Sequence, residues 1–286
     1  KVDAIRHNSA TSDAITTASD GTCTARITGM TGGGGLSHRN IFINGAMTVA
    51  QRGVSSTTNG YGSVDRFYVG YNAVQEAPTQ QQISLDSSDT GPYETGFRNA
   101  LKITNGNQTS GAGAGEYIFI NMPQEAQNLA TSGWNYKSSS SFITLSFWIK
   151  SSVAQNFFFQ FDVRDGTRQN YTMETGSLTA NTWTKITKVI PGNSNLTIDN
   201  DNGVGAYVTF GVFWGTNYTA SMSLETWGAA NDSAKTPDNP TNWYNTNDAT
   251  LEFTGIQLEV GPVATPFEHL PYAENFRRCA RYCYQW

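Results

Sequence analysis

The sequence is poor in the residues on which most catalytic and metal sites depend. Its 286 residues include three cysteines and three histidines, and only 14% are Asp, Glu, Lys or Arg. Cys23 stands alone, whereas Cys279 and Cys283 are four residues apart in a segment of helical spacing. This is neither a disulfide framework nor a zinc site with nearby histidines, so we expect inert thiols and no metal.

The charge argues against a nucleic-acid-binding protein, and the distribution of apolar residues argues against a membrane-spanning one. The 18 basic residues are scattered and the net charge is −5, so no basic stripe is available for nucleic-acid phosphates. No apolar run approaches the roughly 18 residues of a membrane span, and no basic and apolar leader opens the chain. We expect a soluble protein with neutral or hydroxyl-rich partners. Because the sequence opens at Lys1, we expect a processed protein or the end of a longer polypeptide.

Aromatic residues make up 12% of the chain and glycines number 28, a composition typical of strands joined by polar turns. Ten short β-type runs are expected at residues 41–43, 66–71, 82–85, 101–103, 117–120, 143–150, 156–164, 183–190, 206–214 and 251–260. With no long helical stretch between them, these runs predict an all-β fold, an antiparallel jelly-roll-like β-sandwich.

Alternation within the runs predicts which side chains are buried. The expected core positions of two runs are Ile143, Leu145, Phe147, Ile149, Phe157, Phe159, Phe161 and Val163. After the second run, Asp165 and Gly166 predict a two-residue hairpin turn. In the last run, a bulge at Gly255 would keep Leu251 and Leu258 on the same face.

The two ends of the chain differ from this β-rich body. Residues 1–39 are expected to form a shaft or connector segment, with a hairpin turn at Asp20-Gly21 and a flexible linker at Gly32 to Gly35. The sandwich domain is expected over residues 40–270. Residues 271–286 predict a C-terminal helix with one apolar stripe, made of Tyr272, Phe276, Cys279 and Cys283.

Motifs near both ends of the sandwich resemble a known family. They are residues 40–53 (NIFINGAMTVAQRG), 65–68 (DRFY), 254–261 (TGIQLEVG), 264–268 (ATPFE), 271–272 (PY) and 279–282 (CARY), and together they resemble the distal module of bacteriophage tail fibres. Residues 2–28 resemble the segment that precedes this module in fibres of phages that infect marine cyanobacteria. Residues 145–150 and 183–187 are similar to core strands of jelly-roll carbohydrate-binding modules.

The resemblance implies a homotrimeric tail-fibre protein of the virion, made in the host cytoplasm and joined to other tail proteins. Its distal domain would contact a glycan or protein on the host cell surface, with no membrane insertion. The resemblance transfers no site residue. Carbohydrate-binding modules often hold a structural calcium through acidic residues on the first and last strands. Here those strands offer Asn44, Thr48, Gln51 and Thr254-Gly255, so we expect no calcium and no cofactor.

Catalytic arrangements are not found in the sequence. Gly-x-Ser-x-Gly does not occur, and the three histidines lie in the N-terminal segment, in the linker and beside the C-terminal helix. A glycosidase needs two carboxylates, and the pairs weighed were Asp162 with Asp165, Asp199 with Asp201, and Glu252 with Glu259. Asp162 is two residues from Arg164, as in a surface ion pair, and Asp199 lies in a turn-rich Asn/Asp loop. We therefore expect a protein that is not an enzyme.

Aromatic residues in two polar loops are the candidates for a binding site. Indole and phenol rings pack against the C–H face of a sugar while Asn, Asp and Thr bind its hydroxyls. The candidates are Trp134, Tyr136, Tyr218, Trp227, Trp243 and Tyr244. Alternatively, such rings plug the loop ends onto the sandwich or pack between subunits.

The resemblance to tail fibres, taken with the loop aromatics, implies host attachment through weak, multivalent glycan binding by a trimer. Three alternatives remain open. The chain could be a carbohydrate-binding module of a secreted polysaccharide-degrading enzyme or a purely structural component of the virion. As a minor option, it could cleave polysaccharide.

Overall fold

The computed structural model describes residues 4–6, 15–17, 19, 23–25 and 38–284. The chain divides into two compact units, residues 1–37 and residues 38–286. In the first unit, strands β1 (Ala4–Ile5), β2 (Ile15–Thr17) and β3 (Cys23–Ala25) form an antiparallel sheet in that order. The pairing of β2 with β3 is that of the expected hairpin. Its turn, Asp20-Gly21, and the linker glycines 32–35 lie outside the described residues.

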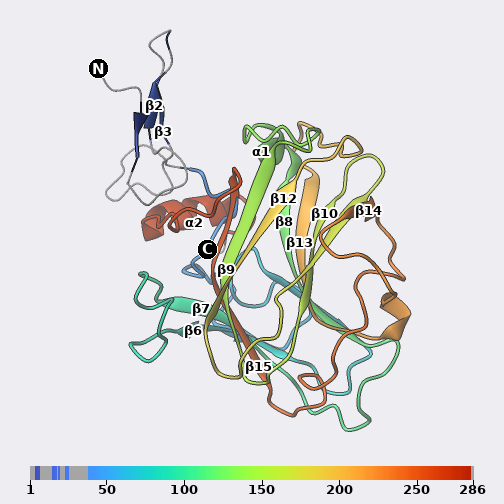
Figure 1. Ribbon diagram of the computed structural model, residues 1–286. Coiled ribbons are helices and arrows are strands. Elements are labelled where there is room, and N and C mark those ends of the chain that lie inside the picture. Colours follow the sequence, from blue (N-terminus) through green and yellow to red (C-terminus); the bar gives the residue numbers. More distant parts are fainter. Residues whose placement is uncertain (1–3, 7–14, 18, 20–22, 26–37, 285–286) are drawn as a thin grey trace. The chain divides into compact units, whose positions relative to one another are not determined.

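The second unit is a sandwich of two six-stranded antiparallel sheets (Figure 1). Sheet I has the order β14-β11-β10-β13-β8-β5, and sheet II has the order β12-β9-β15-β7-β6-β4. The strands are β4 (Ser55–Ser56), β5 (Tyr68–Asn72), β6 (Thr79–Ser84), β7 (Asn99–Thr104), β8 (Tyr117–Glu125), β9 (Phe142–Ser151), β10 (Phe158–Val163), β11 (Gln169–Glu174), β12 (Thr184–Pro191), β13 (Val204–Trp214), β14 (Trp227–Ala229) and β15 (Thr250–Val260). The helices are α1 (Ala126–Ala130), the 3₁₀ helix η1 (Thr216–Tyr218) and α2 (Tyr272–Ala280). The predicted antiparallel β-sandwich with a short C-terminal helix is confirmed.

The core lies between the two sheets and is rich in phenylalanine. Both faces predicted from alternation, on β9 and on β10, are buried. Across the layers the Phe147 and Phe159 ring centroids are 5.3 Å apart, and those of Phe210 and Phe253 are 4.5 Å apart. Each fully buried ring of this kind contributes about 1.5–3 kcal/mol relative to exposure, so the facing sheets hold each other in place.

The expected strand at residues 41–43 is absent because the side chain of Asn40 replaces part of the ladder. Its Oδ1 accepts hydrogen bonds from the backbone N–H groups of Phe42 and Leu258, both at 3.0 Å. The segment is therefore fastened to β15 without forming a strand. The bulge predicted at Gly255 is confirmed, since the register of β15 on β9 shifts between Thr254 and Gln257 and Gly255 has φ +65°.

The hairpin after β10 exists, but its loop is longer than the two residues predicted. Pairing with β11 ends at Val163 and Gln169, which leaves residues 164–168 as the connection. The loop is wider because Arg164 and Arg168 both turn back to the same carboxylate oxygen of Asp162, each at 2.9 Å. Strands β4, β11 and β14 were not predicted.

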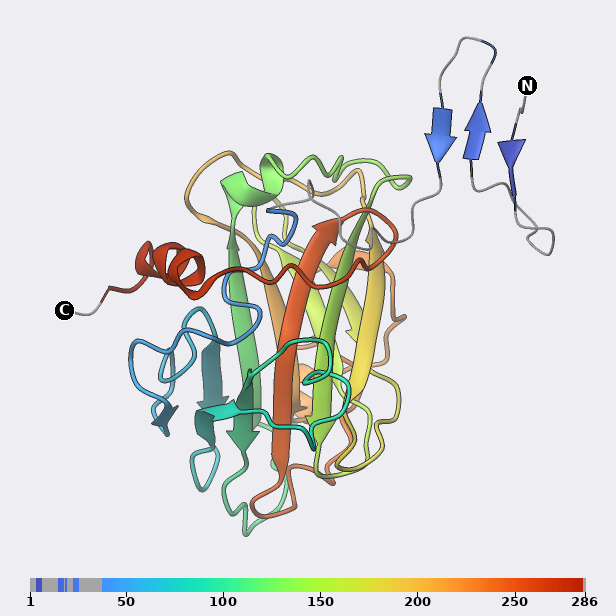
Figure 2. The same cartoon turned by 90° about the vertical axis from the view of Figure 1, so that its left-hand side faces the viewer.

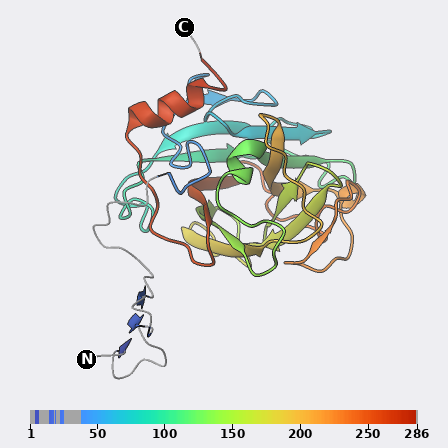
Figure 3. The same ribbon diagram turned by 90° about the horizontal axis from the view of Figure 1, so that it is seen from above.

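The C-terminal helix α2 is present, but most of its predicted stripe is not buried. Tyr272 is 61% exposed, and of the stripe only Cys279 is buried, together with Asn275 one turn before it. The helix packs beside the residues that precede β5 (Figure 3), where the Arg66 guanidinium lies 3.5 Å from the Tyr282 ring centroid. Burial raises the pKa of the Cys279 thiol to about 12, so this thiol stays protonated.

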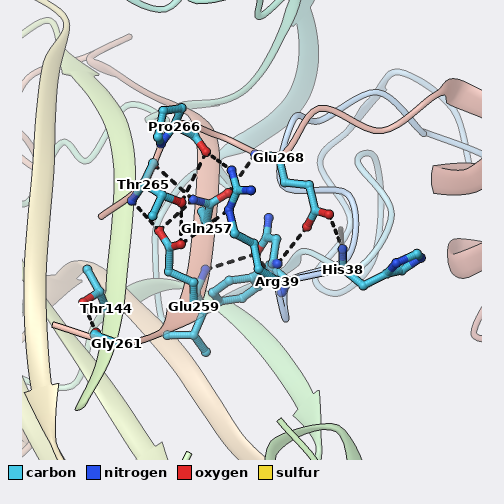
Figure 4. A network of polar contacts seen from close by, with 12 residues as sticks. His38, Arg39, Thr144, Gln257, Glu259, Gly261, Thr265, Pro266 and Glu268 are labelled. Atoms are coloured by element: carbon cyan, nitrogen blue, oxygen red, sulfur yellow. Dashed lines mark hydrogen bonds and ion pairs between the residues drawn. The ribbon is translucent and has the colours of Figure 1, made fainter. Parts of the chain in front are cut away.

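The two ends of the sandwich domain are joined by a buried polar network (Figure 4). Glu259 accepts hydrogen bonds from the N–H and the hydroxyl of Thr265, at 2.8 and 2.6 Å, and from Gln257 Nε2 at 2.8 Å. Glu268 accepts from the backbone N–H groups of His38 and Asn40. The residues of the terminal motifs thus fix where the chain enters and leaves the sandwich.

Candidate functional site

Three of the six predicted binding aromatics are buried, which corrects their proposed role. Trp243 is 0% exposed and its Nε1 donates to the Thr250 carbonyl at 3.0 Å. Tyr244, beside it, stacks on Phe213 with ring centroids 4.1 Å apart. Trp134 is 3% exposed. These rings seal the ends of the sandwich, as in the alternative interpretation, and offer no face to a ligand.

The other three predicted aromatics lie in different places. Tyr136 is half-buried, and its hydroxyl donates to the Ile198 carbonyl at 3.3 Å. Trp227, on β14, covers Tyr171 with a centroid separation of 5.2 Å, and its Nε1 donates to the Pro191 carbonyl at 2.7 Å. Only Tyr218 lines a cleft that combines aromatic and charged side chains.

This cleft lies on the outer face of sheet I and has a volume of about 450 Å³. Strands β8, β10 and β13 supply its floor through side chains that alternate with core residues. The lining residues are Tyr117, Phe119, Asn121, Gln160, Asp162, Arg164, Arg168, Tyr207, Thr209, Trp214, Tyr218, Asp232 and Lys235.

One wall of the cleft is a group of packed aromatic rings. The Phe119 and Trp214 centroids are 5.4 Å apart with 11° between the ring planes. Tyr117 lies 5.2 Å from Trp214, and Tyr218 lies 5.3 Å from Tyr117. Trp214 is buried at the centre of the group, and the half-buried rings of Tyr117, Phe119 and Tyr218 around it supply apolar surface at the side of a polar cleft.

Two glycines and a bulge create the space for these rings. In the ladder Phe119 lies between Gly70 and Gly211. A Cβ on Gly70 would be 2.3 Å from the Phe119 ring, and one on Gly211 would be 2.3 Å from Trp214 Nε1. The register of β13 on β8 also shifts between Gly211 and Phe213, and this bulge turns Trp214 to the outer face.

The opposite wall is a chain of ion pairs centred on Asp162. Its Oδ2 binds both Arg164 and Arg168, and Arg168 continues to Asp232 at 3.2 Å. Asp232 also binds Lys235 at 2.5 Å. The hydrogen bond from Lys235, followed by that from Arg168, lowers the pKa of Asp232 to about 2. Burial by itself would lower the pKa of Arg168, but its bonds to Asp162 and Asp232 raise it above the ordinary value.

The floor between the walls is polar and incompletely paired. Thr209 donates to Asn121 Oδ1 at 2.6 Å, and Gln160 donates to the Lys235 carbonyl at 2.6 Å. Asp162 is only 6% exposed, and no hydrogen-bond partner of its Oδ1 or of Arg168 Nε is found among the described residues. An unpaired buried polar atom costs about 1–3 kcal/mol, so these two atoms lower the stability that the ion-paired wall supplies.

Asp232 and Lys235 come from a segment that we call the strap (residues 219–240). Thr219 and Thr236 form a parallel bridge within it, and the Ala220 N–H donates to the Thr236 carbonyl at 3.0 Å. The Lys235 N–H donates to the Tyr218 carbonyl at 2.7 Å, which keeps the strap against the aromatic wall. The Lys235 ammonium lies 5.4 Å from the Trp214 ring centroid.

A larger hollow of about 730 Å³ lies among α1, α2 and residues 38–43, but it has different chemistry. Its buried carboxylate, Glu125, is bound by Arg281 at 2.9 and 3.2 Å. Burial by itself would raise the pKa of Glu125, but the bonds from Arg281, Gln127 and Tyr282 lower it to about 2. Tyr282 is its only aromatic lining residue among residues 38–284, so the cleft of sheet I is the better site for a ligand with a flat apolar face.

The acidic pairs considered from the sequence lie in ion pairs, hydrogen-bond networks or turns. Asp162 holds two arginines, Glu252 binds Lys150 at 2.9 Å, and Glu259 belongs to the network of Figure 4. Asp165 accepts from the backbone N–H of Asp199. In the part of the chain that the structure describes, no group of three or more His, Cys, Asp or Glu side chains could bind a metal ion. None of the helices described there has the length and apolar character needed to cross a membrane.

Comparison with known proteins gives structural likeness without sequence relatives. No protein-family model matches the chain, and no curated protein does. The tailspike protein 4 enzymatically active domain of bacteriophage CBA120 is similar with a TM-score of 0.41 and 9% identity, over 78% of this chain and 22% of that one. A family 4 carbohydrate-binding module is similar with a TM-score of 0.37 and 12% identity, over 76% of this chain and 98% of that one. The family 11 carbohydrate-binding module of a Clostridium thermocellum cellulase is similar with a TM-score of 0.33 and 12% identity, over 75% of this chain and 98% of that one.

Proposed function

We propose that this chain is a non-catalytic, glycan-binding protein of a virion tail fibre that attaches the particle to the host cell surface. The observation that carries the proposal is the cleft of sheet I, where the rings around Trp214 face the ion-paired wall around Asp162. A sugar has the same two kinds of surface, a C–H face that packs on rings and hydroxyls that need donors and acceptors.

We expect a single cleft of this kind to bind a glycan weakly, and assembly compensates for this. We infer that the protein is a homotrimer joined to other tail proteins, an inference that rests on the resemblance of its terminal motifs to tail fibres. Three copies of the cleft on one fibre raise the apparent affinity by about 10² to 10⁴ without any new contact.

The experiment combines the oligomeric state with competition on cells. Purified protein is expected to elute as a trimer and to block adsorption of the phage to its host. The variant Tyr218→Ala removes an edge ring of the cleft and should reduce binding by about tenfold. Tyr272→Ala is the matched control, because this ring is exposed on α2 outside the cleft.

The outcomes separate the alternatives. A trimer that assembles normally but neither blocks adsorption nor binds glycan would indicate a purely structural virion component. A monomer that binds polysaccharide would instead indicate a module of a polysaccharide-degrading enzyme. Equal effects of Tyr218→Ala and Tyr272→Ala on binding would show that the glycan does not bind in the cleft.

A further inference from the structure

The charge of the cleft is opposite to that of the whole protein. Three cations, Arg164, Arg168 and Lys235, and two carboxylates, Asp162 and Asp232, line it. The cleft therefore has one positive charge in excess, although the chain carries a net charge of −5. An excess cation in a partly dehydrated cleft attracts an anionic ligand more strongly than it would in open water.

The three cations differ in how many of their N–H groups already bind a carboxylate. Lys235 is bound to Asp232 and lies against the Trp214 ring. Arg168 uses both terminal nitrogens for Asp162 and Asp232. Arg164 uses only Nη1, for Asp162, and within residues 38–284 no other acceptor binds its guanidinium.

Arg164 is also held in a fixed position with part of its surface open. The buried carboxylate of Asp162 binds it from one side, and its guanidinium carbon lies 5.3 Å from the Tyr207 ring centroid. The side chain remains 35% exposed. A planar guanidinium fixed in this way can offer its remaining N–H groups to two oxygens of one acid group, the geometry that carboxylates and sulfates accept.

We propose that the ligand of this cleft is an acidic glycan, whose carboxylate or sulfate is bound by Arg164 while the sugar ring packs on the half-buried rings of Tyr117, Phe119 and Tyr218. The inference rests on the proposed glycan-binding function and names the chemical class of the glycan. Arg168 and Lys235 act as positioning residues, since their ion pairs with Asp162 and Asp232 set the wall against which the acid group lies.

The test is affinity electrophoresis of the full chain in gels that contain matched polysaccharides. Polygalacturonate, alginate and hyaluronate are each compared with their methyl-esterified forms, which keep the backbone and lose the charge, and dextran sulfate is compared with dextran. At least one acidic form is expected to retard the protein about tenfold or more over its neutral counterpart, and added salt should weaken this binding.

The variants show whether Arg164 is responsible. Arg164→Gln should reduce binding of the acidic form by about 10- to 100-fold, the equivalent of a lost charged hydrogen bond. Arg164→Lys keeps the charge without the planar donors and should fall between. Arg277→Gln is the control, since it removes one positive charge from an arginine that is 75% exposed on α2. Thermal unfolding of each variant shows that the fold is kept.

Each result decides a different claim. Equal retardation by the acidic and neutral forms, unchanged in Arg164→Gln, would overturn the acidic ligand and leave glycan binding in place. Equal losses in Arg164→Gln and Arg277→Gln would overturn the role of Arg164. The lack of retardation by any polysaccharide in the panel would overturn the proposed function itself, and the inference with it.

Discussion

The outer faces of the two sheets carry similar residues, but on sheet II these residues bind a loop of the chain and on sheet I they line a cleft. On sheet II, Trp148 and Trp183 lie close to Lys150 and Asp89, much as Trp214 lies close to Lys235 and Asp232 on sheet I. The connection between β6 and β7 crosses in front of sheet II (Figure 2). On sheet I, Trp214 is itself buried at 5% exposure, and the half-buried rings of Tyr117, Phe119 and Tyr218 beside it line the cleft that faces the strap.

The covering loop of sheet II (residues 85–97) binds the polar and apolar groups that a ligand would otherwise find. Asp89 accepts hydrogen bonds from Lys150 Nζ at 2.9 Å and from Trp183 Nε1 at 2.8 Å. Phe97 and Leu85 form a small second core with Ala46 and Ala100, against which Trp148 packs. An aromatic ring on the outside of a sheet is therefore a ligand-binding candidate only where the chain does not cover it.

The largest effect is expected from exchanging one tryptophan on each face. Trp214→Ala should abolish glycan binding and cost about 3–5 kcal/mol of unfolding free energy, because the ring is buried by its neighbours. Trp148→Ala should cost less, since its ring is only partly buried, and should leave binding unchanged. Denaturant unfolding and affinity electrophoresis measure both quantities. Loss of binding in Trp148→Ala would contradict the division between the faces.

Removal of the central carboxylate of the cleft should have the next largest effect. Asp162→Asn weakens the bonds to Arg164 and Arg168, leaves Arg164 without its counter-charge and leaves Arg168 with Asp232 alone. The unfolding free energy should fall by about 1.5–3 kcal/mol, and glycan binding should weaken because Arg164 is no longer held in position. If stability fell but binding stayed at the wild-type value, the ion-paired wall would be structural only.

The corresponding change on sheet II should loosen the covering loop alone. Asp89→Asn weakens the bonds to Lys150 and Trp183 and should cost about 1–2 kcal/mol. Hydrogen exchange is expected to rise in residues 85–97 and to stay unchanged in β8 and β13. A rise in the strands of sheet I would show that the two faces are coupled.

The smallest effect concerns pH and the strap. The pKa of Asp232 in the folded protein is about 2, below its ordinary value of 3.8, so its contribution to stability is present above pH 3.8 and is lost as the pH falls toward 2. The stability difference between wild type and Asp232→Asn should therefore shrink over this range. Denaturant unfolding at pH 2–5 measures it, and a difference that is constant with pH would show that Asp232 is not paired in solution.

Much of the fold follows from the sequence because apolar and polar residues alternate along strands such as β9 and β10. The same alternation that buries Phe159 and Phe161 turns Gln160 and Asp162 outward, so part of the cleft was visible in the pattern. The spacing of Asp162 and Arg164 predicts an ordinary surface ion pair. The neighbouring residues in the sequence do not show that Arg168 and the strap bury the carboxylate.

The misassigned aromatics depend on contacts between distant residues. Trp243 and Tyr244 lie in a polar segment that looks solvent-exposed, yet Asn105 Nδ2 donates to the Tyr244 carbonyl at 2.7 Å and Gln155 Oε1 accepts from the Trp243 N–H at 2.8 Å. These partners are far away along the chain. Likewise, β11 was missed because Gln169–Glu174 has a mostly polar sequence, and only its place beside β10 makes it a strand.

The Gly70–Phe119–Gly211 row fixes the position of the aromatic wall, whereas the charged wall opposite it depends partly on the strap. Neither glycine tolerates a side chain without displacing a ring, so the aromatic wall is tied to the backbone of three neighbouring strands. The charges opposite it arrive partly on the strap, one continuous surface segment at the sheet margin. If the proposed function holds, substitutions in that single stretch would change which charged ligand the cleft prefers and leave the ring wall as it is.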